Sequence, residues 1–183
     1  MSYCTAIPAM QPTSRQALHQ YYHDNHYGFP IHDDNELFGR LIMEINQAGL
    51  SWETILRKEE GFRRAYDRFE VIKVARYGDT ERKRLLEDRG IIRNRLKINA
   101  AIENAKTIVT LQQEYGSFEQ WLDHHHPLPL HEWTKLFKKM FKFTGGEIVN
   151  EFLMSTGYLP GAHDPDCPAY AAVLEAKPKW AIG

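Results

Sequence analysis

Apolar residues recur along this chain at intervals of three and four positions, which is the spacing of one face of an α-helix. The clearest run contains five such residues: Leu37, Phe38, Leu41, Ile42 and Ile45. It predicts a helix that Asp33 or Asp34 caps and that ends before Gly49. No run alternates apolar and polar residues as a half-buried strand does. The pattern therefore predicts an all-α protein.

Weaker runs predict further helices on both sides of this one. They lie at residues 12–22, after Ser51, around 62–69, at 79–88, at 96–108, around 136–140 and at 147–154, with a short helical or irregular piece at 71–75 and a loop at 124–129. The expected helix at 79–88 ends just before Gly90, and the next helix begins a few residues later. Two helices with so short a connection form a helical hairpin.

Length and charge narrow the class of protein. A chain of 183 residues with 43% hydrophobic residues is long enough for one packed core, so we expect a single domain. The formal net charge of −1 gives no overall attraction to nucleic acid, so any DNA-binding surface has to be local. No apolar stretch is long enough to span a bilayer and no secretory leader is visible, so we expect a soluble, cytoplasmic protein.

Basic residues follow the hairpin glycine. After Gly90 and two isoleucines, the next helix opens with Arg93, Arg95 and Lys97. Backbone N–H groups at such a hairpin and at the start of its second helix point outward, where a DNA phosphate can accept their hydrogen bonds. The segment is typical of a helix-hairpin-helix DNA-binding element. The alternative is an ordinary turn between helices, followed by a solvated basic helix start.

Five short segments together carry a resemblance to a known family. They are Tyr22-His23-Asp24-Asn25 with Gly28 and Pro30, Glu44-Ile45-Asn46-Gln47-Ala48-Gly49-Leu50-Ser51-Trp52, Gly90-Ile91-Ile92-Arg93 with Lys97-Ile98, Phe141-Lys142-Phe143 with Gly145, and His163 with Cys167. In this order they resemble the Tag family, the type I DNA-3-methyladenine glycosylases of the helix-hairpin-helix superfamily. The resemblance covers about residues 4–168.

The resemblance implies both a fold and an activity. The fold is a two-lobed helix-hairpin-helix domain over residues 1–183, with the hairpin at about 80–110 and both termini in a lobe that carries structural zinc. The activity is that of a monomeric base-excision-repair enzyme that flips 3-methyladenine out of alkylated double-stranded DNA and hydrolyses its N-glycosidic bond. The alternative is a helix-hairpin-helix protein that binds DNA without excising a base.

The chemistry that this activity needs is modest. A base methylated at N3 carries a positive charge, so it leaves without being protonated and water is the nucleophile. Many helix-hairpin-helix glycosylases place a catalytic aspartate after the hairpin, but the Tag family lacks it. Neither Glu114 nor Asp123 is therefore assigned that role, and no lysine forms a Schiff base.

The resemblance also assigns a base pocket. Its catalytic residue is Glu44, which accepts hydrogen bonds from the methylated base and complements its charge. Helical spacing puts Glu44 at the edge of the apolar face, so we expect it to be half-buried, where an unpaired carboxylate is costly. The alternative is a surface glutamate at the margin of an amphipathic helix. Four residues are expected to bind the base, unless they are plain core residues: Tyr22, Trp52, Tyr27 and His19.

Four positions depart from the family pattern around this pocket. Ala6 stands where the family has a tryptophan, and His26 and Tyr27 stand where it has an acid and a tryptophan. His19 replaces an aromatic residue. These departures leave open a glycosylase with an altered lesion preference.

DNA contacts are implied at two places. One is the hairpin, with Gly90 and the three basic residues that follow it. The other is the end of the Glu44 helix, with Gly49 and Leu50. Leu50 is a candidate for filling the gap that a flipped base leaves in the duplex; the alternative is one more core leucine.

Finally, the resemblance implies a zinc site at Cys4, His23, His163 and Cys167. Two thiolates and two imidazoles give Zn²⁺ a full tetrahedral set, so such a site is structural rather than catalytic. From the residues alone, two cysteines near opposite ends of the chain are as readily incidental.

Overall fold

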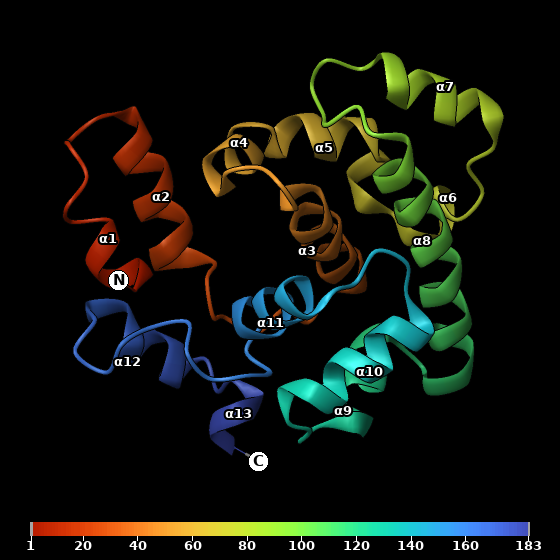
Figure 1. Cartoon of the computed structure of the whole chain (residues 1–183). Coiled ribbons are helices and arrows are strands. Elements are labelled where there is room, and N and C mark those ends of the chain that lie inside the picture. Colours follow the sequence, from red (N-terminus) through yellow and green to blue (C-terminus); the bar gives the residue numbers. More distant parts are fainter. Residues whose placement is uncertain (1, 183) are drawn as a thin grey trace.

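The computed structural model describes residues 2–182, and every regular element in that range is helical (Figure 1). This confirms the all-α prediction. The elements are α1 (Tyr3–Ala6), α2 (Ser14–Asn25), α3 (Asp34–Gln47), α4 (Trp52–Arg57), α5 (Glu59–Ala65), the 3₁₀ turn η1 (Asp67–Phe69), α6 (Val71–Val74), α7 (Asp79–Glu87), α8 (Arg95–Tyr115), α9 (Phe118–His125), α10 (Leu130–Met140), α11 (Gly146–Ser155), α12 (Pro168–Glu175) and α13 (Lys179–Ile182).

Most helices occur where the apolar spacing predicts them. Asp33 caps α3 by accepting a hydrogen bond from the backbone N–H of Glu36 at 2.9 Å, and Ser51 caps α4 through the N–H of Thr54. The expected loop at 124–129 is shorter, because α9 runs to His125 and α10 begins at Leu130. The pattern did not predict α9, α12 or α13, which are short helices.

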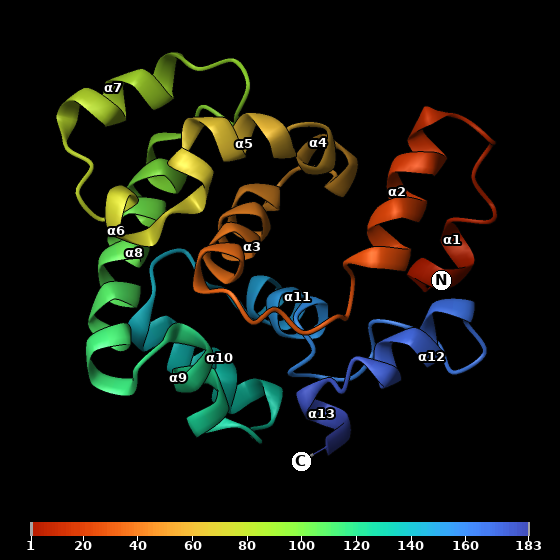
Figure 2. The same cartoon turned by 180° about the vertical axis from the view of Figure 1, so that it is seen from behind.

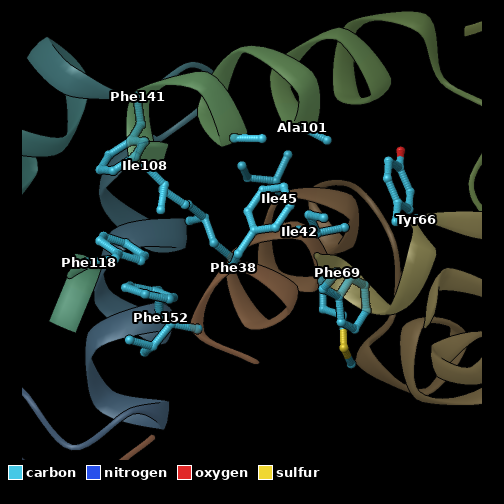
Figure 3. Close-up of a cluster of buried hydrophobic side chains, with 14 of the residues drawn as sticks. Phe38, Ile42, Ile45, Tyr66, Phe69, Ala101, Ile108, Phe118, Phe141 and Phe152 are labelled. Carbon is cyan, nitrogen blue, oxygen red and sulfur yellow. The ribbon is translucent and has the colours of Figure 1, made fainter. Parts of the chain in front are cut away.

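Helix α3 lies at the centre of the molecule in both views (Figures 1 and 2). Its residues from Leu37 to Asn46 are all buried, and it packs against α4, α5, α6, α8, α9, α11 and η1. Figure 3 shows Phe38, Ile42 and Ile45 of α3 among side chains of other helices, including Ala101, Ile108, Phe118 and Phe152. A helix with apolar contacts on so many sides organises the core.

A left-handed turn interrupts the helix expected around residues 62–69. Asp67, Arg68 and Phe69 have φ values of 49°, 55° and 62°, a conformation that is costly for residues other than glycine. The turn places the Phe69 ring against Gly39 of α3, where a Cβ atom on Gly39 would lie 2.3 Å from that ring. Burial of Phe69 against this glycine offsets the strain of the turn.

The hairpin between α7 and α8 rests on another glycine contact. A Cβ atom on Gly61 of α5 would lie 2.2 Å from the carbonyl oxygen of Gly90. Gly90 lies three residues beyond the end of α7, and it is not among the residues with positive φ, so it is not the helix-ending glycine that the sequence suggested. Its N–H donates to the Asp88 carboxylate at 2.7 Å, which closes the turn instead.

The two ends of the chain lie on the same side of the molecule, with α1 and α2 beside α12 and α13 and opposite α6–α8 (Figures 1 and 2). The backbone N–H of Asp164 donates to Cys4 Sγ at 3.3 Å, and the Ser2 hydroxyl donates to the Asp164 carboxylate. These contacts join segments that are some 160 positions apart in the sequence. The first and last segments therefore form one packed region.

The contact between Gly61 and Gly90 predicts that Gly61→Ala destabilises the protein by about 1–3 kcal/mol, the usual effect of overpacking. The added methyl group meets a backbone carbonyl that cannot turn aside. Gly146→Ala is the control, because its Cβ would lie 3.8 Å from the nearest side chain, and it should be neutral or slightly stabilising. Thermal unfolding of both variants checks this, and equal melting temperatures would contradict it.

Candidate active site and metal cluster

A cavity of about 530 Å³ opens between α2, α3, α4 and α11. It is lined by Tyr3, Tyr22, Tyr27, Glu44, Gln47, Trp52, Glu147, Asn150 and Glu151. This volume lies within the usual range of small-molecule pockets. Of the residues that the sequence assigned to a base pocket, Glu44, Tyr22, Trp52 and Tyr27 meet here.

Aromatic rings form one wall of this cavity. The Tyr22 and Trp52 rings lie 5.2 Å apart between centroids, and those of Tyr22 and Tyr27 lie 5.8 Å apart. Tyr3 packs edge-on against Tyr27 at 5.5 Å. The arrangement gives a flat aromatic molecule several faces on which to stack.

Glu44 is the most unusual group in the cavity. Only 3% of its surface is exposed, so it is more deeply buried than the half-buried position predicted from helical spacing. No hydrogen bond joins its carboxylate to another residue within 2–182. Burial raises the pKa of Glu44 from 4.5 to about 8, partly offset by Arg40 and reinforced by Glu151. A buried carboxylate without a hydrogen-bond partner, at the wall of a cavity, is typical of a binding site.

Arg40 is the cation whose charge lowers the pKa of Glu44, and it lies one helical turn earlier on α3. Its guanidinium is 8% exposed, lies 5.2 Å from the centre of the Tyr22 ring and donates to the carbonyl of Ser155 at 3.2 Å. It therefore lowers the cost of the buried Glu44 charge from behind the aromatic wall. The sequence analysis did not single out Arg40; its four-residue spacing from Glu44 on a buried helix is the signal that marks it.

Two donors in the cavity wall are left without partners. The hydroxyl of Tyr22 and the indole Nε1 of Trp52 are both buried and make no hydrogen bond in the described part of the chain. Buried polar groups are nearly always satisfied, so each such exception calls for an explanation. Tyr22 and Trp52 line the cavity, whereas Trp133, whose Nε1 is also buried without a partner, does not.

The positions that depart from the family pattern lie at different distances from the cavity. Tyr27 lines it, whereas His19, His26 and Ala6 are not among the lining residues. His19 lies behind the aromatic wall, where its Nδ1 and the Tyr3 hydroxyl are 2.7 Å apart. Tyr3, which the sequence analysis did not select, supplies an aromatic ring from α1. Its place directly before Cys4 was the available signal.

Cys4, His23, His163 and Cys167 come together as a cluster that can hold a metal ion. Their ligand atoms all lie within 4.8 Å of one another, and the four sulfur-to-nitrogen distances are 3.3, 3.6, 3.6 and 3.7 Å. A tetrahedron with zinc bond lengths of about 2.0–2.3 Å has edges of about 3.3–3.8 Å. The donor types and their spacing both fit zinc.

Each histidine of this cluster also has the outer partner that a metal ligand needs. The second ring nitrogen of His23 lies 2.7 Å from the Asp24 carboxylate, and that of His163 lies 2.6 Å from the backbone carbonyl of Tyr27. Such contacts orient an imidazole so that its other nitrogen faces the metal. The second one also ties the cluster directly to a residue that lines the cavity.

The hairpin presents backbone donors next to exposed charge. Arg93 and Arg95 are exposed, and the N–H groups of Ile92, Arg93 and Arg95 donate to no other residue in the described range. Asn94 caps α8 by accepting from the N–H of Lys97 at 3.1 Å. This surface is suited to an anion such as a phosphate.

Lys97 differs from the expectation that it contacts phosphate. It is 5% exposed, and its ammonium donates to the carbonyls of Asn46 and Ala48 at 2.8 and 2.7 Å. Burial lowers its pKa. The lysine therefore caps the C-terminal end of α3 from the first turn of α8, where the helix dipole favours a cation. Its role is to join the hairpin to the loop that follows Glu44.

That loop carries Gly49 and Leu50, which are both exposed. At 38% exposure Leu50 is not a core leucine, so the alternative raised by the sequence is excluded. Leu50 stands between the last turn of α3 and Trp52, next to the cavity.

Comparisons with known proteins agree with this geometry. The methyladenine glycosylase family matches residues 12–136. The chain is 34% identical to DNA-3-methyladenine glycosylase 1 of Escherichia coli, over 86% of this chain and 94% of that protein. It is 30% identical to a DNA-3-methyladenine glycosylase of Haemophilus influenzae, over 84% and 92%.

Solved structures give the same result. The fold is similar to that of 3-methyladenine DNA glycosylase I from Staphylococcus aureus, with a TM-score of 0.77, 30% identity and coverage of 87% of this chain and 93% of that one. A variant of a 3-methyladenine DNA glycosylase I in complex with 3-methyladenine matches at a TM-score of 0.78 and 30% identity, covering 92% and 97%. Among residues 2–182, no helix is both long and apolar enough to cross a bilayer. By sequence and by structure, the chain belongs to the methyladenine glycosylase family.

Proposed function

We propose that the cavity beside Glu44 is the pocket in which this base-excision-repair glycosylase holds 3-methyladenine flipped out of alkylated double-stranded DNA. The observation that carries the proposal is the Glu44 carboxylate, buried and without a hydrogen-bond partner in an aromatic cavity. The orphan donors of Tyr22 and Trp52 support it, because a purine offers acceptors to both. The family and the names of the relatives agree on the reaction, which is hydrolysis of an N-glycosyl bond.

The pocket favours a cationic base by physical means. A buried carboxylate faces little competing solvent, so its attraction for the charge of an N3-methylated adenine is strong, and the face of Trp52 adds to it. Neutral adenine gains neither interaction. When the cation enters, it lowers the pKa of Glu44 from its raised value and favours the ionised form.

The bond cleavage itself asks little of the protein. The methylated base departs with the bonding electron pair and becomes neutral, and a water molecule adds to the sugar carbon and gives up a proton. Glu44 holds the base in the orientation in which this occurs. Stacking on Tyr22 and Trp52 keeps the base out of the duplex, at about 1–3 kcal/mol per stacked base in other systems.

The metal of the Cys4, His23, His163 and Cys167 cluster is proposed to be a structural zinc ion. Four protein ligands leave no open position for a substrate, so its contribution is to cross-link the two ends of the chain. We further propose that residues 1–183 form one glycosylase domain of two lobes, with the termini in the zinc-bearing lobe and the helix-hairpin-helix element at about 80–110. The shared side of α1, α2, α12 and α13 supports this division.

DNA is proposed to lie across the hairpin and the Leu50 loop, bound to a monomer. Arg93, Arg95 and the free N–H groups beside them are suited to phosphate contacts, which set position without reading sequence. Leu50 is suited to fill the gap in the duplex. Lys97 links these two surfaces through its hydrogen bonds to the end of α3. Contacts between the hairpin and the DNA phosphates therefore set how far Leu50 enters the duplex.

A DNA-binding protein without excision is the weaker candidate. It gives no reason to keep a carboxylate in an aromatic cavity, where burial of the charge is costly. His19 and the other altered positions bear on which lesions enter, and His19 is proposed to act by holding Tyr3 against the wall.

The first test is release of bases from methylated duplex DNA, measured by chromatography. Wild type should release 3-methyladenine and spare adenine. Glu44→Gln should slow release about tenfold or more, because it loses charge-assisted hydrogen bonds of about 1.5–3 kcal/mol, and Trp52→Ala should also slow it. Glu175→Gln, which changes an exposed glutamate at the end of α12, is the matched control and should behave as wild type. No release by wild type above the spontaneous rate would contradict the proposal.

A second prediction follows from the pKa of Glu44. An unfolded glutamate ionises near 4.5, whereas Glu44 in the native protein stays protonated until about pH 8, so native stability falls as pH rises through this interval. Glu44→Gln removes this loss. Its melting temperature should exceed that of wild type by a margin that grows from about pH 5 to pH 8 and then levels off. A margin that does not change with pH would show that Glu44 is not held protonated.

A third prediction concerns the metal. Elemental analysis of purified protein should find one zinc ion per chain. Cys167→Ser should lose the metal and lower the melting temperature, since metal binding stabilises only the folded state. His131→Gln, an exposed histidine outside the cluster, should change neither. Metal-free wild type whose melting temperature is unaffected by added zinc would refute the assignment.

A further inference from the structure

A second carboxylate faces the same cavity as Glu44. Glu151 comes from α11, lines the cavity and is half-buried. One of its oxygens accepts a hydrogen bond from the Tyr27 hydroxyl at 3.2 Å. The other oxygen has no hydrogen-bond partner within the described chain.

We propose that Glu151, held in place by the Tyr27 hydroxyl, is a second recognition carboxylate of the base pocket, and that the pair Glu44 and Glu151 restricts the substrates to cationic purines that offer N–H donors to both. This inference rests on the base pocket proposed above. It assigns a specificity-determining role to Glu151 and a positioning role to Tyr27, and Tyr27 is one of the positions that depart from the family pattern.

The electrostatics of the cavity support a cationic ligand between the two acids. Burial raises the pKa of Glu151, and the charge of Glu151 contributes to the raised pKa of Glu44, so Glu151 opposes ionisation of Glu44. No lysine or arginine forms an ion pair with either carboxylate in the described residues. Arg40 offsets part of the cost of the Glu44 charge without forming an ion pair with it, and a cation that enters the cavity stabilises both acids further.

The position of Tyr27 is set by the metal cluster and the aromatic wall. Its backbone carbonyl lies 2.6 Å from His163 Nε2, and its ring packs against Tyr3 and Tyr22. These packed contacts therefore hold the Tyr27 hydroxyl against Glu151. This is the preorganisation that a recognition group requires, since little order has to be gained when the base enters.

Glu147 provides an internal comparison. It lies one turn before Glu151 on α11 and also lines the cavity, but it is exposed to solvent and makes no hydrogen bond with Tyr27 in the described residues. Solvent screens its charge, so it contributes little to selection of the base. The two glutamates differ in burial and support, not in chemistry.

The test compares Glu151→Gln with Glu147→Gln in excision of 3-methyladenine from methylated duplex DNA. On the plateau above pH 8, Glu151→Gln should lower kcat/KM about tenfold, the usual effect of one charge-assisted hydrogen bond, and Glu147→Gln less than twofold. Glu151→Gln should also shift the acidic limb of the pH profile to lower pH, because Glu44 no longer faces a second negative charge. Arg40 and Tyr22, which also face Glu44, are unchanged in these variants.

Tyr27→Phe is the second variant, which keeps the ring and the backbone carbonyl but releases Glu151. It should reduce kcat/KM by a smaller factor than Glu151→Gln. If Glu151→Gln does not fold, Tyr27→Phe tests the proposal in its place. An active wild type matched by Glu151→Gln in both rate and pH profile overturns this inference alone. A wild type that releases no 3-methyladenine overturns the proposed base pocket and this inference with it.

Discussion

The burial of helix α3 on nearly every side is the constraint on which the rest of this structure depends. Because the helix is surrounded, its apolar residues form the core, and any polar residue on it has to find a partner or face a cavity. The Arg40 guanidinium packs over the Tyr22 ring and donates to the Ser155 carbonyl. The carbonyls at the C-terminal end of the helix accept hydrogen bonds from Lys97. Glu44 faces the cavity without a hydrogen-bond partner, which is the observation behind the proposed base pocket.

The same constraint explains a conflict between stability and function. A protonated or unpaired Glu44 contributes nothing to the fold that glutamine would not, and above pH 5 its burial costs stability. In the proposed function, the interaction that offsets this cost forms when a cationic base enters the cavity. Binding sites commonly contain buried groups of this kind, since the ligand supplies the hydrogen-bond or charge partner that the protein does not provide.

Contacts between segments far apart in the sequence fix the positions of the side chains around the cavity. The metal cluster joins the two ends of the chain and, through His163, fixes Tyr27 at the cavity. Lys97 joins the hairpin to the end of α3, between Glu44 and Leu50. The proposed DNA-contact surface, Leu50 and the proposed base pocket are thereby connected by a few hydrogen bonds, most of them to backbone carbonyls.

The sequence by itself determined the helical class, the position of α3 and the short connection between α7 and α8, because helical spacing reports these directly. The four residues of the Cys/His cluster came from the family resemblance, and the structure brings them together. Only the tertiary structure decided how deeply Glu44 is buried, that Lys97 turns inward, and that Tyr3, Arg40 and Glu151 belong to the cavity. Helical periodicity shows which face of a helix is apolar, but not what packs against it. A side chain at the margin of that face is buried or exposed according to its neighbours from distant segments. For Glu44 such a neighbour is Glu151 from α11, more than a hundred residues away.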